Sequence, residues 1–573
     1  MSLAQTERAS SRGGLGLRPA LLTALALSAL GLGSACAVPP ASPARAAETP
    51  RCEATQDDYS YFRSPESKAR ARLASRSLQA PSLLAGETPE RMTMVARMAH
   101  YRVPAMSLVA FRSGGIDWSM SRGFRRVDQS EPVTRQARFQ VASLSKMVTA
   151  AMILRLAEEG KVDLDAPVER YLRRWKLPKS SLSLGGAITL RRLLSHTAGF
   201  GAPRAPYALL AAELLSLPEI LDRPLPTRGK LKTRYGEPLY AVGERWSYSA
   251  AGYCVIQQVV EELLGMPFAL AAQTLVFDPL QMFRTTFEQI SARRLALDDC
   301  AGHRRGGSPL PEEARLYPCV AAAGLWSSAE DLARFGIELS KAYRGASRWL
   351  SAASVEALRS PTSPKPPLSA EEYGLGTALH RIGESVWMGH HGQVPGFRAL
   401  LRMRLEEDVG YVILTNSDEG EALIAEVERG LARAQGFRGF EPLMQARVET
   451  SMETLAPYVG SYTLERGIPA LLQVEASSLS LSVAGGAPSR LHFEGNDRFS
   501  FLYGGLPRYL EYQRAPQGRA DVGQPHAFTL YVGARRIQAL KGSTPPEIAS
   551  RNRKLRHALL RRMVACKSCA RAR

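Results

Sequence analysis

The chain has 573 residues, which is enough for two or more domains. Its apolar content of 45% and charged content of 22% are globular values, and they exclude an intrinsically disordered chain. The net charge is +20, but the basic residues are spread along the chain. This spread indicates general basicity, suited to anionic surroundings such as a cell envelope, and argues against a nucleic-acid-binding stripe.

The first 47 residues have the pattern of an export signal. Basic residues precede an apolar run at 21–32, and small residues follow it. The apolar run is too short for a stable transmembrane helix. We therefore expect export to the periplasm or cell envelope, with cleavage after Ala37 or Ala46.

Cys36 offers an alternative to release by cleavage. It ends the stretch Gly-Ser-Ala-Cys at 33–36, which resembles a bacterial lipoprotein box. The box usually has leucine three positions before the cysteine, where this chain has Gly33. Both a lipoprotein anchored through Cys36 and a released protein therefore stay open.

The chain has seven cysteines, too few for a disulfide scaffold. Cys300 and Cys319 flank a loop rich in Gly, Pro and Arg, and we expect that they can pair in an oxidising compartment. Cys566 and Cys569 lie in the tail, and a lone Cys-x-x-Cys is weak evidence for a metal site. No His-Glu-x-x-His set and no phosphate-binding glycine loop occurs, so we predict no metal and no cofactor.

The predicted elements begin after a linker. Residues 48–80 are polar and rich in Arg and Ser, which indicates a linker. Strand-like runs at 103–111 and 116–120 flank a turn with two glycines and predict a hairpin. Strong helix formers at 147–159, with no Gly or Pro until Gly160, predict an apolar, buried helix.

Helices and loops follow, and then strands return. Residues 161–320 are predicted to be mainly helical and loop segments, with one helix within 188–200 closed by a glycine. Another helix is expected from about residue 330. Apolar runs at 399–405 and 409–416 predict paired strands, and 421–434 a closing helix. This order indicates one α+β domain at 81–440, with a sheet built from both ends of the chain.

Past residue 445 the pattern changes to short alternating runs separated by Gly, Pro, Asn and Ser. It predicts an all-β domain at 445–542, a small barrel or sandwich. Residues 543–573 form a basic tail, for which an exposed segment is favoured over a membrane anchor.

The chain is organised around Ser143 and Lys146, the one Ser-x-x-Lys pair in the sequence. Positions three apart share one face of a helix, so the lysine amine can reach the serine hydroxyl. A serine needs a neighbouring base to become a nucleophile, and a lysine can be that base only if its pKa falls well below about 10.4. Burial is one way to lower it. The plain alternative is that Ser143 caps the helix and Lys146 is a solvated charge.

Two further stretches, at 243–253 and 389–397, complete a pattern with 139–146. In order and spacing the three resemble the motifs of the serine β-lactamase and penicillin-binding-protein superfamily, most closely its class C β-lactamase, D-alanyl-D-alanine carboxypeptidase and esterase branch. Residues 188–200 and 322–333 also resemble that family. The resemblance covers about 85–435, and implies an antiparallel sheet flanked by helices plus an all-helical part. The later β domain resembles a lipocalin-like module that is often appended to such hydrolases.

The resemblance implies a role for each motif residue. Ser143 is the expected nucleophile, and Lys146 helps to deprotonate it. Tyr248 passes a proton to the leaving group, for which we expect nearby positive charge to lower its pKa. The third motif is expected to bind the substrate: His390 orients it or assists Tyr248, Gly392 allows close approach of a strand, and the N–H groups of Gln393 and the nucleophile form an oxyanion hole.

The chain departs from the family at Ala250, where the second motif, Tyr-x-Asn, has asparagine. That amide usually contacts the lysine and the substrate amide, so turnover of β-lactams and peptides is in doubt. His391 is expected to be a neighbour and not a catalyst, and His196 to be structural. Tyr248 and Trp246 are core aromatics in the plain alternative.

We therefore expect an exported serine hydrolase that acts through an acyl-enzyme on an ester, a short D-amino-acid peptide or a β-lactam, with no nucleic-acid partner. The alternative from another class is a non-catalytic binding protein on the same fold, with Ala250 as a mark of lost activity.

Overall fold

The computed structural model describes most of residues 60–541. The expected signal segment at 1–47 with Cys36, and the basic tail with its Cys566–Cys569 pair, therefore lie outside the described residues. Short gaps within the range fall at 87, 181, 183–185, 202–205, 209–213, 225–233, 290–297, 363–370, 446–447, 449, 465–467, 476–477, 484–487, 504–505, 515–524 and 533–534.

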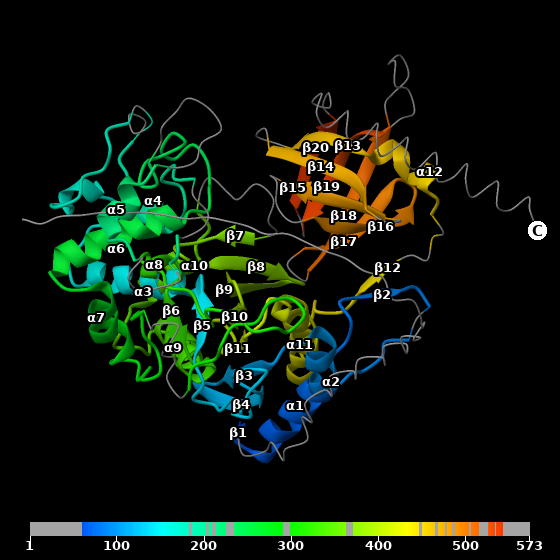
Figure 1. Cartoon of the computed structure of the whole chain (residues 1–573), viewed down its shortest axis with the longest axis horizontal. Helices are drawn as coiled ribbons and strands as arrows, with labels where there is room; N and C mark the ends of the chain where they lie inside the picture. Colours follow the sequence, from blue (N-terminus) through cyan, green and yellow to red (C-terminus); the bar gives the residue numbers. More distant parts are fainter. Residues whose placement is uncertain are drawn as a thin grey trace, which may run out of the picture. The chain divides into compact units, whose positions relative to one another are not determined.

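An eight-stranded antiparallel sheet forms the centre of the first domain (Figure 1). Its strands come from both ends of the domain, as the sequence predicts. In spatial order they are β1 (Ser60–Phe62), β4 (Gly115–Gly123), β3 (Ala105–Arg112), β11 (Val409–Thr415), β10 (Phe397–Arg404), β9 (Ser385–Val394), β8 (Ala378–Ile382) and β7 (Glu371–Tyr373).

The two predicted strand pairs are confirmed. β3 and β4 are joined by a tight turn in which Ser113 and Gly114 both have positive φ, the backbone form that favours glycine in such hairpins. β10 and β11 pair in continuous register from Arg398 opposite Thr415 to Arg404 opposite Val409.

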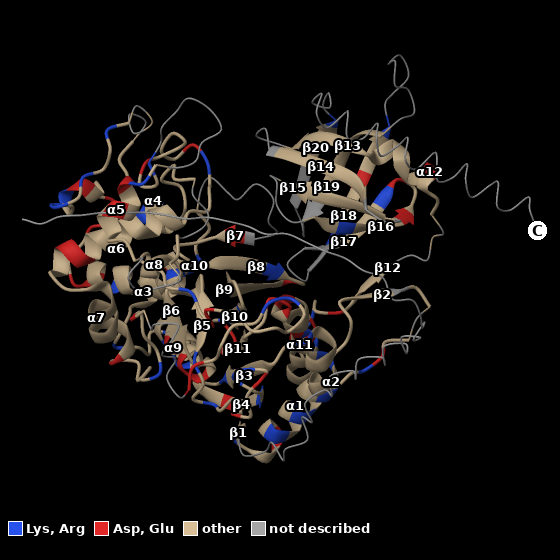
Figure 2. Cartoon of the chain, viewed as in Figure 1, with Lys and Arg blue, Asp and Glu red and all other residues tan. Residues whose placement is uncertain are grey.

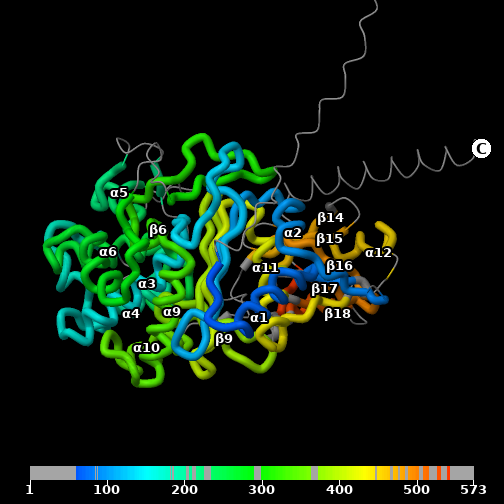
Figure 3. The backbone as a smooth tube through the Cα atoms, turned by 90° about the horizontal axis from the view of Figure 1, so that it is seen from below, coloured from blue at the N-terminus to red at the C-terminus, as the bar shows by residue number. Residues whose placement is uncertain are grey.

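Helices cover both faces of this sheet (Figure 3). One apolar core joins the sheet to α1 (Pro65–Arg76), α2 (Met94–Tyr101) and α11 (Gly420–Gln435). The second, larger core joins its other face to α3 (Leu144–Glu158) and α9 (Ala329–Tyr343). The predicted α+β architecture is thus a sheet between two helical layers.

The expected linker at 48–80 is corrected by this arrangement. Strand β1 and helix α1 belong to the folded domain from Ser60 onward. Asp117 of β4 accepts from Ser67 at 2.6 Å and from Arg70 at 2.7 Å, so α1 is tied to the sheet. The Arg and Ser content that indicated a linker instead supplies these buried polar contacts.

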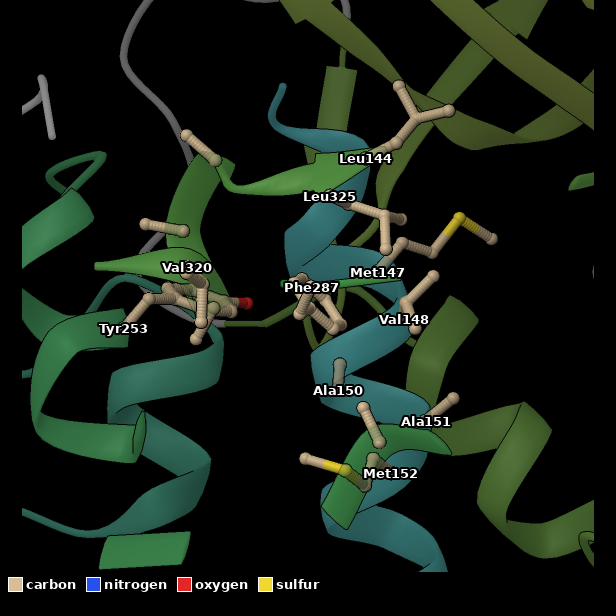
Figure 4. Close-up of a cluster of buried hydrophobic side chains, with 14 of the residues drawn as sticks. Leu144, Met147, Val148, Ala150, Ala151, Met152, Tyr253, Phe287, Val320 and Leu325 are labelled. Carbon is tan, nitrogen blue, oxygen red and sulfur yellow. The ribbon is translucent and has the colours of Figure 1, made fainter. Parts of the chain in front are cut away.

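Helix α3, which carries the Ser-x-x-Lys pair at its start, is deeply buried. Of its 15 residues, 12 are buried, on all sides of the helix. Figure 4 shows its apolar side chains among those of neighbouring segments, including Tyr253, Phe287, Val320 and Leu325. Burial of each large apolar side chain contributes about 1.5–3 kcal/mol, so several together anchor the helix firmly.

The helical part follows α3 in the chain. Its helices are η2 (Val168–Arg170), α4 (Leu190–Leu194), α5 (Leu217–Asp222), α6 (Ala250–Leu264), α7 (Phe268–Ala272), η5 (Gln273–Phe277), α8 (Val320–Ala323) and α10 (Ala352–Arg359). The helix expected within 188–200 is short and ends at Ser195, before Gly199. Strands β5 (Phe139–Ala142) and β6 (Leu325–Ser327) pair as a small separate sheet.

A disulfide joins Cys254 of α6 to Cys319. The expected pairing of Cys300 with Cys319 is therefore wrong, because Cys319 already has a partner and Cys300 is a buried free thiol. Sequence proximity across a loop favoured the wrong pair, whereas the packing of α6 against α8 brings the correct one together.

No single described helix has the length and hydropathy of a membrane span. One bent pair of helices, Ala250–Leu264 with Phe268–Phe277, passes that test together.

The second domain is a closed eight-stranded antiparallel barrel, as the alternating pattern predicts. The short alternating runs past residue 445 correspond to seven of these eight strands, and β20 has no such run. The short α12 (Met452–Leu455) and η6 (Ala456–Tyr458) precede the barrel, and β12 (Leu443–Gln445) pairs with β2 (Ser82–Leu84) of the first domain. The barrel strands are β13 (Gly460–Leu464), β14 (Ile468–Glu475), β15 (Ser478–Val483), β16 (Ser489–Gly495), β17 (Arg498–Tyr503), β18 (Leu506–Arg514), β19 (Pro525–Val532) and β20 (Arg535–Lys541).

Basic side chains occur on many elements of the described chain, interleaved with acidic ones (Figure 2). This distribution agrees with the general basicity expected from the sequence.

Truncation of the chain after Gln445 tests whether the barrel is needed for chemistry. The barrel has its own apolar core, and that core contains no residue of the three motifs. We expect the truncated chain to keep its melting transition and to hydrolyse p-nitrophenyl esters within a few-fold of the full rate.

The matched control ends at residue 440 and thus also removes β12, with its buried Leu443. A folded chain ending at Gln445 that has lost all ester turnover would contradict this prediction.

Candidate active site

Ser143 lies at the turn between strand β5 and helix α3. The preceding residue, Ala142, has φ +51°, an unusual conformation for a residue with a side chain. Ser145 holds this turn, since its hydroxyl donates to the Ala142 carbonyl at 2.6 Å and accepts from the Leu325 N–H at 3.1 Å. Ser143 occupies the N-cap position but makes no capping hydrogen bond, so the plain alternative of a helix cap is wrong.

Lys146 points into the protein, one turn further along α3. Only 2% of it is exposed, so it is not a solvated charge. Its Nζ lies 3.2 Å from the Ser143 hydroxyl oxygen. Burial disfavours the charged amine and lowers the pKa of Lys146 to about 7. The sequence requirement for a lysine base, a strongly lowered pKa beside the serine, is met.

A backbone carbonyl fixes the lysine amine from the other side. Lys146 Nζ donates to the Ala322 carbonyl of α8 at 2.6 Å. The preceding carbonyl, of Ala321, accepts from Thr149 of α3 at 3.1 Å. Since the disulfide joins Cys319, directly before α8, to α6, the short helix is fixed at its start as well.

Tyr248 lies directly before α6. Lys146 Nζ is 4.8 Å from the centre of its ring. The residue keeps some exposure, but its hydroxyl lies deep in the protein, and burial raises the pKa of Tyr248, while a hydrogen bond with Ser143 acts in the opposite direction. The expectation of a pKa lowered by positive charge is therefore wrong: burial raises the pKa of Tyr248, and the phenol keeps its proton at neutral pH.

His390 of β9 lies next to this group, with its ring 6.2 Å from that of Tyr248. Its Nδ1 is 2.6 Å from the His391 carbonyl, which only accepts, so Nδ1 carries a hydrogen. Its Nε2 is 3.0 Å from the Tyr373 hydroxyl of β7. In the neutral ring Nε2 therefore accepts from Tyr373, which fixes both the orientation and the tautomer of His390.

Gly392 brings β9 against the strand that leads to the serine. A Cβ at this position would lie 2.2 Å from the Val141 carbonyl of β5, so a side chain would separate the two strands. Gln393 follows in β9 with an exposed side chain. The close approach of β5 and β9 is compatible with an oxyanion hole formed by the N–H groups of Ser143 and Gln393. This oxyanion hole stays a prediction.

His391 lies on the opposite face of β9, as alternation along a strand requires. Its Nε2 is 3.2 Å from Arg402, which donates to Glu428 of α11 at 2.6 Å. His391 is therefore a neighbour of the site and part of a buried polar network behind the sheet.

Ala250 is the first residue of α6 and is 1% exposed. Its methyl group offers no hydrogen bond, so the amide of the family motif has no counterpart at this position. The Ala322 carbonyl supplies the hydrogen-bond acceptor for the lysine. The site thus retains a way to hold Lys146 and lacks a side-chain amide for the substrate.

Sequence reasoning missed two groups of the site. Tyr373 carries no motif, although Gly374 and Gly376 directly after it are a signal of close backbone approach: a Cβ on Gly376 would lie 2.8 Å from the Lys146 carbonyl. The Ala322 carbonyl has no sequence signal at all, because every residue carries one.

The site holds no cluster suited to a metal. Within the described ranges, no three His, Cys, Asp or Glu side chains are grouped as metal ligands. A cavity of about 920 Å³ lies elsewhere, at the other end of α3, where Arg155 and Glu159 line it. The groups gathered at the site are the Ser143 hydroxyl, the Lys146 amine with its lowered pKa and the protonated Tyr248 hydroxyl.

Comparisons with known proteins agree with this geometry. A family model described as Beta-lactamase matches residues 91–435, more than half of the chain. Esterase EstB of Burkholderia gladioli is 31% identical over 255 residues, which are 40% of this chain and 64% of EstB. The match therefore spans less than two thirds of that relative. Penicillin-binding protein 4* of Bacillus subtilis is 25% identical over 69% of this chain and 87% of its own.

A solved structure shares the fold. The octameric penicillin-binding protein homologue from Pyrococcus abyssi superposes with a TM-score of 0.51 at 21% identity, over 78% of this chain and 98% of its own. With three motifs gathered around Ser143 on this fold and a family model that covers most of the first domain, the chain belongs to the β-lactamase family of serine hydrolases.

Proposed function

We propose that this chain is an exported serine hydrolase that acts through an acyl-enzyme on Ser143, with an ester, a short D-amino-acid peptide or a β-lactam as substrate. One observation carries the proposal: the Lys146 amine lies 3.2 Å from the serine hydroxyl, and burial lowers its pKa to about 7. A neutral amine at that distance is a general base for the hydroxyl.

In the proposed acylation, the Ser143 oxygen attacks the substrate carbonyl and its proton passes to Lys146 Nζ. The N–H groups of Ser143 and Gln393 stabilise the oxyanion, where one donor is typically worth about 10²–10³ in rate. Tyr248 keeps its proton because burial raises its pKa, so it is suited to deliver that proton to the leaving group. The lysine then returns a proton to the tyrosine. Water then attacks the acyl-enzyme, and the proton transfers among Tyr248, Lys146 and Ser143 run in the reverse order.

His390 is proposed to orient the substrate beside Tyr248. Tyr373 supports this role, because its hydroxyl fixes the histidine tautomer at 3.0 Å. His390 would thus present one defined face to the substrate and not a freely rotating ring.

Esters are the proposed preferred substrates. Ala250 cannot hold a substrate amide, and a buried polar group left without a hydrogen-bond partner costs about 1–3 kcal/mol. An ester has no amide N–H that needs such a contact. The name of EstB, an esterase, supports this preference, and that of penicillin-binding protein 4* keeps peptides and β-lactams as candidates.

Export to the periplasm or cell envelope is also part of the proposal. It is supported by the pattern of residues 1–47 and by the net charge of +20, which favours anionic surroundings.

Substitution of Ser143 by alanine tests the nucleophile. We expect Ser143→Ala to abolish covalent labelling by a fluorophosphonate and to leave the melting temperature within a few degrees, because the hydroxyl caps no helix. Labelling is measured by intact mass.

Ser340→Ala is the matched control, since Ser340 is buried and its hydroxyl has no hydrogen-bond partner within the described chain. Persistent labelling of Ser143→Ala would reject the proposed nucleophile. A wild-type chain that takes no label and hydrolyses no ester would instead favour the non-catalytic binding protein.

Restoring the motif amide tests the substrate preference. We expect Ala250→Asn to raise kcat/KM for a β-lactam or D-peptide by roughly tenfold or more, and for a p-nitrophenyl ester much less, because only the amide substrates gain a hydrogen bond. Some loss of melting temperature is expected, since Ala250 is buried.

Ala250→Ser is the control, as it adds polarity without the reach of an amide. The preference would be disproved by a natural chain that hydrolyses nitrocefin as efficiently as simple esters.

A further inference from the structure

Tyr248 belongs to the loop before α6, and one residue holds this loop on both sides of it. The N–H of Ser247 donates to the His196 carbonyl at 2.8 Å. The N–H of Ser249 donates to the His196 ring, at Nδ1, at 3.1 Å. The two backbone amides that flank Tyr248 are therefore both hydrogen-bonded to the same histidine.

The His196 ring also contacts the tyrosine directly. The ring centres of His196 and Tyr248 are 4.4 Å apart, and Tyr373, which supports His390, lies 5.0 Å from the same ring. His196 is 2% exposed. The His196 ring thus packs against both tyrosines of the site and is shielded from solvent.

Two features of His196 are unfavourable for stability alone. Its φ is +60°, in the left-handed region that residues with a side chain seldom occupy, although histidine enters it more readily than most. Its Nε2 is buried and has no hydrogen-bond partner among the described residues. Backbone strain and an unpartnered buried polar atom in one residue beside a reactive group are typical of positions retained for function.

The hydrogen bond also fixes the charge of the ring. Nδ1 accepts from a backbone N–H, so it carries no proton and the imidazole is neutral. Burial, followed by the charges of Lys146 and His390, keeps the pKa of His196 well below its ordinary value. Because the ring next to Tyr248 is neutral, it places no positive charge near Lys146. Such a charge would make protonation of the lysine less favourable.

We infer that His196 is a positioning residue, which holds the Tyr248 hydroxyl in place for proton transfer by bracketing its backbone and packing against its ring. This inference rests on the proposed function, because it assigns His196 to the same proton transfer. It goes beyond a structural role in closing a helix, since it predicts an effect on one chemical step.

The test compares two esters with the same acyl group. Departure of an aliphatic alcohol needs a proton from Tyr248, whereas p-nitrophenolate leaves without one. We expect His196→Ala to lower kcat/KM by roughly 10- to 100-fold for the alkyl ester and by much less for the p-nitrophenyl ester, since small misplacement of a catalytic group has effects of this size.

Conservative variants separate positioning from folding. Asparagine tolerates positive φ and places an oxygen near the position of Nδ1, so His196→Asn should recover most of the alkyl-ester activity. His196→Gln lacks an acceptor there and should not. If His196→Ala fails to fold, the comparison of His196→Asn with His196→Gln takes its place. In a Tyr248→Phe background, His196→Ala should cause no further loss, because the hydroxyl that it positions is gone.

The matched control is His303→Asn. His303 is also fully buried, and its ring accepts from the Val127 N–H at 3.2 Å and donates to the Asn416 carbonyl at 2.9 Å, neither of which belongs to the site. Equal losses for the two esters, the same loss with and without the Tyr248 hydroxyl, or equal activity of the Asn and Gln variants would overturn the inference. The proposed function fails on a separate result, when Ser143→Ala still hydrolyses esters or when the natural chain hydrolyses none.

Discussion

The burial of the Lys146 amine is the constraint on which the rest of the site depends. The amine contacts neutral groups, the Ser143 hydroxyl and the Ala322 carbonyl, and desolvation alone lowers its pKa to about 7. A buried lysine is unfavourable for folding, because the charged amine loses its hydration and the neutral amine binds a proton less tightly than in water. The surrounding structure must therefore hold it in place, and the dense apolar packing of α3 supplies that support.

The same constraint accounts for the way neighbouring elements are fixed. The carbonyl that receives the lysine belongs to α8, a helix of four residues that would not be stable alone. The disulfide from Cys319 fixes it to α6, and the hydrogen bond from Thr149 holds it against α3. Helix α6, which carries this disulfide, begins just after the loop with Tyr248. The same helix therefore supports both the proposed base, Lys146, and the proposed acid, Tyr248.

The sequence predicts the parts of this site that consist of side chains in local patterns. Ser143 and Lys146 lie three apart at the start of an apolar helix, and the structure places both as that spacing predicts. The Cys254–Cys319 pair, the Ala322 carbonyl and the contact of Tyr373 with His390 depend on packing between distant segments, which no local pattern encodes. The pKa of Tyr248 was misjudged for the same reason: the charge of a neighbouring lysine is visible in the sequence, whereas the depth of burial is not.

Direct titration of the Lys146 amine tests the central claim. NMR of the full chain labelled with ¹³C at lysine Cε, with the signal assigned through Lys146→Arg, reports its protonation. We expect a pKa of about 7 in the folded protein, against about 10.4 for an exposed lysine. Since the neutral amine is the base, kcat/KM for esters should rise as pH increases through the same value. A Lys146 signal that titrates near 10, or activity that is unchanged across pH 6–8, would contradict the account.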